Sequence, residues 1–135
     1  MISISKSYSF DAAHTLLNRD WSQAKNDMVF GKCARPHGHT YTLDVTIEGR
    51  VDPETGMILN YFALDDIVKP IVDGDLDHRD LNKVFLDMLT TAENMVAEIA
   101  DQLDLILQNR YPHKEWELVM VSLSETPKTT AVWSR

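Results

Sequence analysis

The chain has 135 residues and a formal net charge of -8, and 44% of its residues are hydrophobic. This length suits a single domain over residues 1–135, but it is short for an enzyme that must enclose a substrate alone, so we expect an active site shared between subunits. The acidic balance argues against nucleic acid or an anionic membrane as a partner, and no apolar run approaches the roughly 20 residues of a membrane helix, so we expect a cytoplasmic protein.

Alternation predicts a first strand from Ile2 to Ala12. Its even positions are mostly apolar and its odd positions are mostly serine, which is the period of a half-buried strand. If the extended chain continues, His14 falls on the apolar side. Residues from Leu17 to Lys32 have no clean period, so we interpret them as a long loop, and loops of this length are usually functional.

The clearest element is a second strand over the alternating segment from Thr40 to Gly49. One face is apolar and the other polar, and the polar face could meet solvent or a wet interior. The apolar face carries Tyr41, Leu43, Val45 and Ile47, and the polar face carries Thr42, Asp44, Thr46 and Glu48. Because successive side chains alternate along a strand, His37 and His39 share the apolar face.

Two helices are predicted next. Apolar residues from Leu64 to Val72 recur at helical spacing, and Pro70 is expected to kink or shorten this helix, which should end by Gly74. The stretch from Thr90 to Glu93 has the form of a capping box and opens a long second helix that should run to about Arg110.

Two strands complete the chain. The segment from Trp116 to Ser124 alternates imperfectly and is apolar on both faces in its middle, so we interpret it as a well-covered strand. Thr129 to Trp133 reads as a final short strand. The order strand, strand, helix, helix, strand, strand predicts an α+β domain: a four-stranded antiparallel sheet with two helices on one face.

Three histidines form a candidate metal site. Two imidazoles one residue apart on an extended chain point the same way, so His37 and His39 can bind one ion, and His14 could complete the set. Three neutral imidazoles with an open fourth position are the arrangement of catalytic zinc. A hydrogen-bonded core residue is the competing interpretation of His14, and His113 is interpreted as a surface residue.

Cys33 has two interpretations. It is the only cysteine, so it cannot form an intrachain disulfide. As a fourth ligand it would make the zinc structural, and as a thiolate it would be a base or nucleophile. Its neighbours Lys32 and Arg35 favour the thiolate, but the residues alone leave both interpretations open.

Three further side chains could do chemistry. Asp77 next to His78 could form an acid/base pair, with a solvated turn as the alternative. Glu125 at the end of a strand could accept two N–H donors of a planar heterocycle, or be an ordinary charge at a strand end. Lys32 and Arg35, with Arg79 and Lys83, could gather into a local cationic patch or remain solvated surface charges.

Taken together, these residues resemble the superfamily of 6-pyruvoyl-tetrahydropterin synthase and 6-carboxytetrahydropterin synthase. The resemblance covers nearly the whole chain and rests on five motifs in the right order. They are Phe10-Asp11-Ala12-Ala13-His14, Phe30-Gly31-Lys32-Cys33 with His37-Gly38-His39, Leu76-Asp77-His78-Arg79-Asp80-Leu81-Asn82, Thr91-Ala92-Glu93-Asn94 and Glu125-Thr126-Pro127.

The resemblance implies a site and an assembly. It implies that His14, His37 and His39 bind Zn²⁺, that Cys33 is the catalytic thiol, and that Asp77 and His78 transfer protons. It implies substrate binding by Glu125, Thr91, Arg35 and Lys32, with Glu125 on the 2-amino and N3 groups of a pterin. It also implies the tunnelling fold, in which three subunits close a twelve-stranded barrel and two trimers form a homo-hexamer with sites at subunit interfaces.

The resemblance leads to a zinc-dependent lyase acting on 7,8-dihydroneopterin triphosphate. The short spacing from Cys33 to His37 looks like the bacterial branch, which makes 6-carboxy-5,6,7,8-tetrahydropterin, acetaldehyde and triphosphate for queuosine and other 7-deazaguanines. The stretch from Phe30 to Cys33 also looks like the branch that stops at 6-pyruvoyl-tetrahydropterin. Asn60-Tyr61 departs from the family's more frequent Asp-Phe. A non-enzymatic zinc module and a zinc hydrolase that needs no thiol are alternatives of other classes.

Overall fold

The computed structural model covers residues 1–135 and contains one antiparallel sheet with the strand order β1-β2-β3-β4. The strands are β1 (Ile2–His14), β2 (His37–Gly49), β3 (Trp116–Thr126) and β4 (Thr129–Ser134). The helices are α1 (Gln23–Phe30), α2 (Tyr61–Lys69), α3 (Leu81–Val84) and α4 (Ala92–Arg110), with a 3₁₀ turn over Gly31–Ala34 and a π-helical turn over Pro70–Leu76. The predicted α+β fold with a four-stranded antiparallel sheet is confirmed.

The core lies between one face of the sheet and the two main helices, α2 and α4. Alternation places apolar side chains of β1 and β2 on this face, and residues such as Leu43 and Ile47 are fully buried. The opposite face of these strands carries hydroxyl and carboxyl groups, and the Asp44 carboxylate accepts hydrogen bonds from Ser7 and Ser122. None of the helices is long and apolar enough to cross a membrane.

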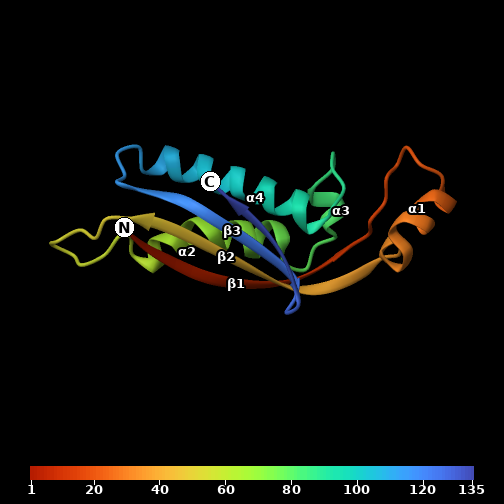
Figure 1. Ribbon diagram of the computed structural model, residues 1–135, viewed down its shortest axis with the longest axis horizontal. Helices are drawn as coiled ribbons and strands as arrows, with labels where there is room; N and C mark the ends of the chain where they lie inside the picture. The colour runs from red at the N-terminus through yellow and green to blue at the C-terminus, as the bar shows by residue number, and fades with distance from the viewer.

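The expected loop from Leu17 to Lys32 is wrong in part, because it contains α1. This helix has no apolar stripe, and its one buried residue is Asn26. It is held instead by polar contacts: Ser22 caps it by accepting from the Lys25 N–H at 3.1 Å, and the Asn26 amide bonds the backbone of Asn18. Figure 1 shows α1 at one end of the molecule, beyond the stacked sheet and helices.

Two helix boundaries differ from the expectation. The first long helix does not stop at Gly74, because a π-helical turn carries the chain from Pro70 to Leu76. Proline has no N–H to donate, and the wider pattern ends with the Asp77 N–H donating to the Val72 carbonyl at 2.8 Å. At the start of α4 the cap is Thr91, which accepts from the Asn94 N–H at 3.3 Å, so the expected capping box does not form.

The imperfect alternation of β3 has a local cause. The pairing of β2 with β3 shifts register between Thr46 and Ile47, where Met120 and Leu118 are the partners and Val119 is the extra residue. A bulge of this kind moves the following side chains to the other face. The interpretation of β3 as a well-covered strand therefore holds at Ser122, which is buried on the polar face, but not at Met120, which is exposed on the same face.

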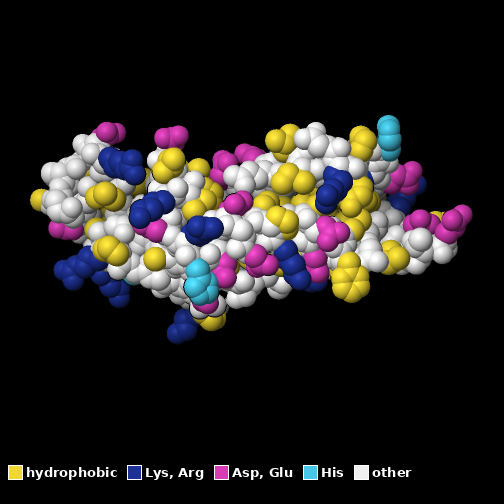
Figure 2. Space-filling model, turned by 180° about the vertical axis from the view of Figure 1, so that it is seen from behind, with side chains coloured by type: hydrophobic (Ala, Val, Ile, Leu, Met, Phe, Trp, Pro, Cys, Tyr) yellow, Lys and Arg dark blue, Asp and Glu magenta, His cyan; other side chains and the backbone are white.

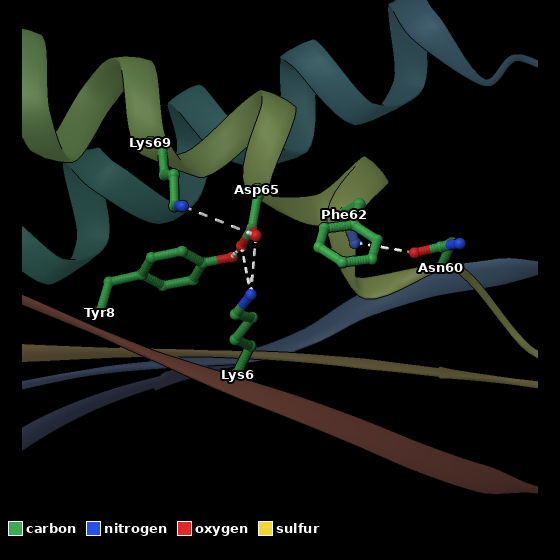
Figure 3. A network of polar contacts seen from close by, with 6 residues as sticks. All are labelled: Lys6, Tyr8, Asn60, Phe62, Asp65 and Lys69. Carbon is green, nitrogen blue, oxygen red and sulfur yellow. Dashed lines mark hydrogen bonds and ion pairs between the residues drawn. The ribbon is translucent and has the colours of Figure 1, made fainter.

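A polar network joins α2 to β1 (Figure 3). The Asp65 carboxylate lies 2.7 Å from Lys6 Nζ, accepts a hydrogen bond from the Tyr8 hydroxyl at 2.7 Å, and has Lys69 Nζ 3.8 Å away. Hydrogen bonds from Lys6 and then Tyr8 lower the pKa of Asp65, while burial raises the pKa of Tyr8. The network thus favours a charged Asp65 carboxylate next to a neutral Tyr8 phenol.

Candidate metal centre and active site

The β1–β2 pairing brings the three predicted histidines together. His14 lies directly opposite His37, and His39 lies opposite Ala12, so all three side chains leave the same face of the sheet. One ring nitrogen from each histidine can be chosen so that all three lie within 4.8 Å of one another. The sequence therefore predicted the cluster correctly, and its position follows from strand parity.

Backbone carbonyls fix the tautomer of two of these imidazoles. His14 Nδ1 lies 2.7 Å from the Thr90 carbonyl oxygen, and His37 Nδ1 lies 2.7 Å from the Arg35 carbonyl oxygen. A carbonyl can only accept, so each Nδ1 carries the hydrogen and each Nε2 keeps a free lone pair. Metal-binding histidines are commonly held in this way.

The cluster has unsatisfied nitrogens that a metal ion would satisfy. The buried side-chain polar atoms without a hydrogen-bond partner are His14 Nε2 and His39 Nε2, which belong to this cluster, and the hydroxyl of Tyr41, whose ring adjoins His39. Burial, more than its histidine neighbours, lowers the pKa of His14, which favours the neutral form that binds metal. The residues present therefore fit one metal ion.

Cys33 lies outside the group of mutually close metal-binding atoms. It is half-buried in the 3₁₀ turn, and its carbonyl accepts a hydrogen bond from the Leu16 N–H at 2.9 Å. This bond places Cys33 next to Leu16, which follows His14, the last residue of β1, by two positions. The arrangement favours a thiol near the cluster over a fourth ligand within it.

Asp77 and His78 face each other. Asp77 Oδ2 lies 3.0 Å from His78 Nδ1, and Asp77 Oδ1 accepts a hydrogen bond from the Asp11 N–H at 2.9 Å. The backbone N–H of Asp11, followed by His78, lowers the pKa of Asp77. The carboxylate is thus ionised and orients the imidazole, whose side chain is 78% exposed and open to a substrate.

The segment carrying this pair runs along the edge of β1. The His78 N–H donates to the Asp11 carbonyl at 2.6 Å, and the Ala13 N–H donates to the Arg79 carbonyl at 3.0 Å. His78 is also the one non-glycine residue with a positive φ, 58°. An open groove of about 590 Å³ lies here, and its lining includes both His39 and His78.

The predicted substrate-binding residues differ in how they relate to the cluster. Glu125 is half-buried near the end of β3, and its Oε2 lies 3.7 Å from His39 Nε2. Thr91 caps α4 immediately after Thr90, whose carbonyl bonds His14. Lys32 and Arg35 are exposed on either side of Cys33 and have no carboxylate within 4.0 Å.

Sequence reasoning missed Thr90, Asn82 and Tyr41. Thr90 contributes a backbone carbonyl, which no side-chain pattern reveals, and Asn82 bonds the backbone of Thr15. The signal for Tyr41 was available, because it follows His37 and His39 on the same face of β2. Its ring centroid lies 5.4 Å from that of His39.

Comparison with known proteins gives consistent matches. A family described as 6-pyruvoyl tetrahydropterin synthase matches residues 3–135. A 6-pyruvoyl tetrahydrobiopterin synthase of Poecilia reticulata is 33% identical over 135 residues, covering 96% of this chain and 88% of that protein. A 6-carboxy-5,6,7,8-tetrahydropterin synthase of Haemophilus influenzae is 32% identical over 107 residues, covering 77% of this chain and 66% of that protein.

Solved structures agree with the sequence matches. The structure of Caenorhabditis elegans 6-pyruvoyl tetrahydropterin synthase has a TM-score of 0.88 with this chain at 31% identity, covering 99% of this chain and 95% of that one. The fold therefore matches that of pterin synthases along almost the whole chain. With the family match over residues 3–135, this shows that the chain belongs to the 6-pyruvoyl tetrahydropterin synthase family, whose enzymes are lyases of pterin synthesis.

Proposed function

We propose that this protein is a zinc-dependent lyase that converts 7,8-dihydroneopterin triphosphate to 6-carboxy-5,6,7,8-tetrahydropterin, acetaldehyde and triphosphate. The observation that carries the proposal is the three-imidazole cluster with the Glu125 carboxylate 3.7 Å from His39. The proposed metal ligands and the proposed acceptor for a planar heterocycle thus adjoin each other. A cytoplasmic location, a single domain over residues 1–135 and a homo-hexamer are parts of the same proposal.

His14, His37 and His39 would hold Zn²⁺, because imidazole nitrogens are ligands that zinc prefers and the open fourth position is typical of catalytic sites. Bound there, zinc would supply Lewis-acid polarisation of the oxygens on the substrate's side chain. The free Nε2 lone pairs of His14 and His37 support this assignment, since both Nδ1 hydrogens are held by carbonyls.

The chain's own residues bind the substrate and move its protons. Glu125 accepts hydrogen bonds from the pterin 2-amino and N3–H groups, which fixes the ring beside the cluster. Asp77 keeps a hydrogen on His78 Nδ1, so His78 Nε2 is free to accept or return a proton, and the Cys33 thiolate is the second proton acceptor. Lys32 and Arg35 bind the triphosphate, and Figure 2 shows Lys and Arg side chains gathered toward the α1 end of the molecule.

A second candidate product, 6-pyruvoyl-tetrahydropterin, is favoured by the Poecilia reticulata relative and the Caenorhabditis elegans structure. The first candidate is favoured by the short spacing from Cys33 to His37 and by the Haemophilus influenzae relative. Purified zinc-loaded protein is to be given 7,8-dihydroneopterin triphosphate and its products identified by mass. We expect acetaldehyde with the carboxy product, and a pyruvoyl product without acetaldehyde would select the second candidate.

Cys33→Ala tests the role of the thiol. We expect the variant to retain stoichiometric zinc, measured by atomic absorption, and to lose turnover, because the cysteine moves protons and binds no metal. If the variant loses both its zinc and its oligomeric assembly, the zinc would instead be structural. Unchanged turnover would indicate a hydrolase that uses no thiol.

A further inference from the structure

Asn82 clamps the chain at the point where β1 leaves the sheet. The β1–β2 ladder ends at the His14 and His37 pair, so Thr15 is the first residue beyond it. The Thr15 N–H donates to Asn82 Oδ1 at 2.8 Å, and Asn82 Nδ2 donates to the Thr15 carbonyl at 2.8 Å. One side-chain amide therefore takes the place of a neighbouring strand for the residue that follows the metal ligand.

Thr90 closes these contacts into a ring around His14. Its hydroxyl lies 3.4 Å from both Asn82 Oδ1 and the Thr15 carbonyl oxygen, and its own carbonyl accepts from His14 Nδ1 at 2.7 Å. Thr90 is 0% exposed and His14 is 2% exposed, so solvent does not replace the bond between them when it is lost, whereas Thr15 and Asn82 are half-buried. The ring passes from His14 to Thr15, then to Asn82, to Thr90 and back to His14.

We propose that Asn82 is a positioning residue for the metal centre, setting metal affinity by holding the backbone and the tautomer of His14 through this ring. Asn82 is neither one of the clustered metal-binding groups nor part of the lining of the groove that includes His39 and His78, and it acts through Thr15 and Thr90. Partners that orient a ligand commonly change metal affinity by about 10–100-fold. The inference rests on the metal site of the proposed function, and it does not depend on which reaction the enzyme performs.

Asn26 provides a matched control. In the α1 segment the Asn18 N–H donates to Asn26 Oδ1 at 2.8 Å, and Asn26 Nδ2 donates to the Asn18 carbonyl at 3.0 Å. This is the same pair of bonds to a single backbone residue, with one further bond from Asn26 Nδ2 to the Ser22 carbonyl at 3.1 Å, and it includes no histidine. Loss of stability alone would therefore affect Asn26→Ala and Asn82→Ala alike, whereas loss of metal affinity would affect only the latter.

The experiment measures Zn²⁺ affinity by competition with a chromogenic chelator, and the visible absorption of Co²⁺-loaded protein. We expect Asn82→Ala to bind Zn²⁺ about tenfold more weakly and to shift the Co²⁺ spectrum. Asn26→Ala should lower the denaturation midpoint and leave affinity and spectrum unchanged. Asn82→Asp keeps the oxygen that accepts from the Thr15 N–H but cannot donate to the Thr15 carbonyl, so it should recover only part of the affinity.

A folded Asn82→Ala variant with the affinity and Co²⁺ spectrum of the original protein would overturn the proposal. If that variant does not fold, Thr90→Val decides, because it keeps the buried shape and removes the hydroxyl that joins Asn82 to Thr90. Weaker Zn²⁺ binding supports the ring, and unchanged binding refutes it. If the protein binds zinc but shows no turnover, the proposed reaction is refuted, but the effect of Asn82 on zinc affinity can still be measured.

Discussion

At the scale of single residues, His78 keeps a conformation that its side chain disfavours. Its φ of 58° lies in the left-handed region, where a residue other than glycine carries a cost of order 1–2 kcal/mol. The neighbouring bonds to Asp11 and Asp77 hold it there. Strained residues of this kind cluster at active sites, which supports His78 as a functional residue.

His78→Gly should therefore separate stability from activity. We expect the free energy of unfolding, measured in urea, to stay within about 1 kcal/mol of the original value, because glycine adopts this φ without strain. Turnover should fall by at least about 100-fold, since the proposed proton-transfer group is lost. His113→Ala, at an exposed loop histidine, should change neither quantity, and a fully active His78→Gly enzyme would contradict the proton-transfer role.

Replacing Tyr41 and Tyr8 by phenylalanine removes a hydroxyl without a hydrogen-bond partner in one case and a hydrogen-bonded hydroxyl in the other. The Tyr41 hydroxyl is buried without a partner, whereas the Tyr8 hydroxyl donates to Asp65 at 2.7 Å. Tyr41→Phe should stabilise the metal-free protein by about 1 kcal/mol, because an unpaired buried hydroxyl is costly. Tyr8→Phe should destabilise it by about 2 kcal/mol, because a bond to a charged group is lost. Urea unfolding of both variants measures the difference, and equal signs would refute this account.

At the scale of elements, the Asp65 network links α2 to β1 through Lys6 and Tyr8. Folding lowers the pKa of Asp65, so the network stabilises the protein above the unfolded value of 3.8, and this contribution is lost as pH falls through the lower folded value. Asp65→Asn should lower the urea midpoint at neutral pH and remove this part of the acid dependence. Its exposed neighbour provides the control: Asp66→Asn should change neither, and an identical response of both variants would refute the network's role.

The predictability of each element follows from where its stabilising contacts come from. β2 could be predicted because its alternation is local and one face is fully buried, and the same parity correctly placed His37 and His39. α1 could not be predicted, because caps and an asparagine clamp hold it without an apolar stripe. The contact of the Thr90 carbonyl with His14 could not be predicted either, because it forms only when α4 packs against the sheet.

At the scale of the whole molecule, the sheet has two open edges, along β1 and β4. Unpaired edges are usually covered in native proteins, and here only the end of β1 is covered, by the segment that carries His78 and Arg79. The proposed homo-oligomer would cover the remainder. Light scattering of the purified protein should give about six times the 15.4 kDa chain mass, and a stable monomer would contradict the proposed assembly.

The placement of all three proposed metal ligands, His14, His37 and His39, on β1 and β2 has a consequence for the order of folding. The two strands meet in register from the Ile2 and Gly49 pair to the His14 and His37 pair, and the histidine end closes the shorter loop. Closing a shorter loop costs less chain entropy, so the ligand set can assemble before α4 arrives. Because a slip of one residue would turn His37 and His39 to the face opposite His14, a metal ion bound at that stage in the proposed site would select the correct strand register for the rest of the sheet.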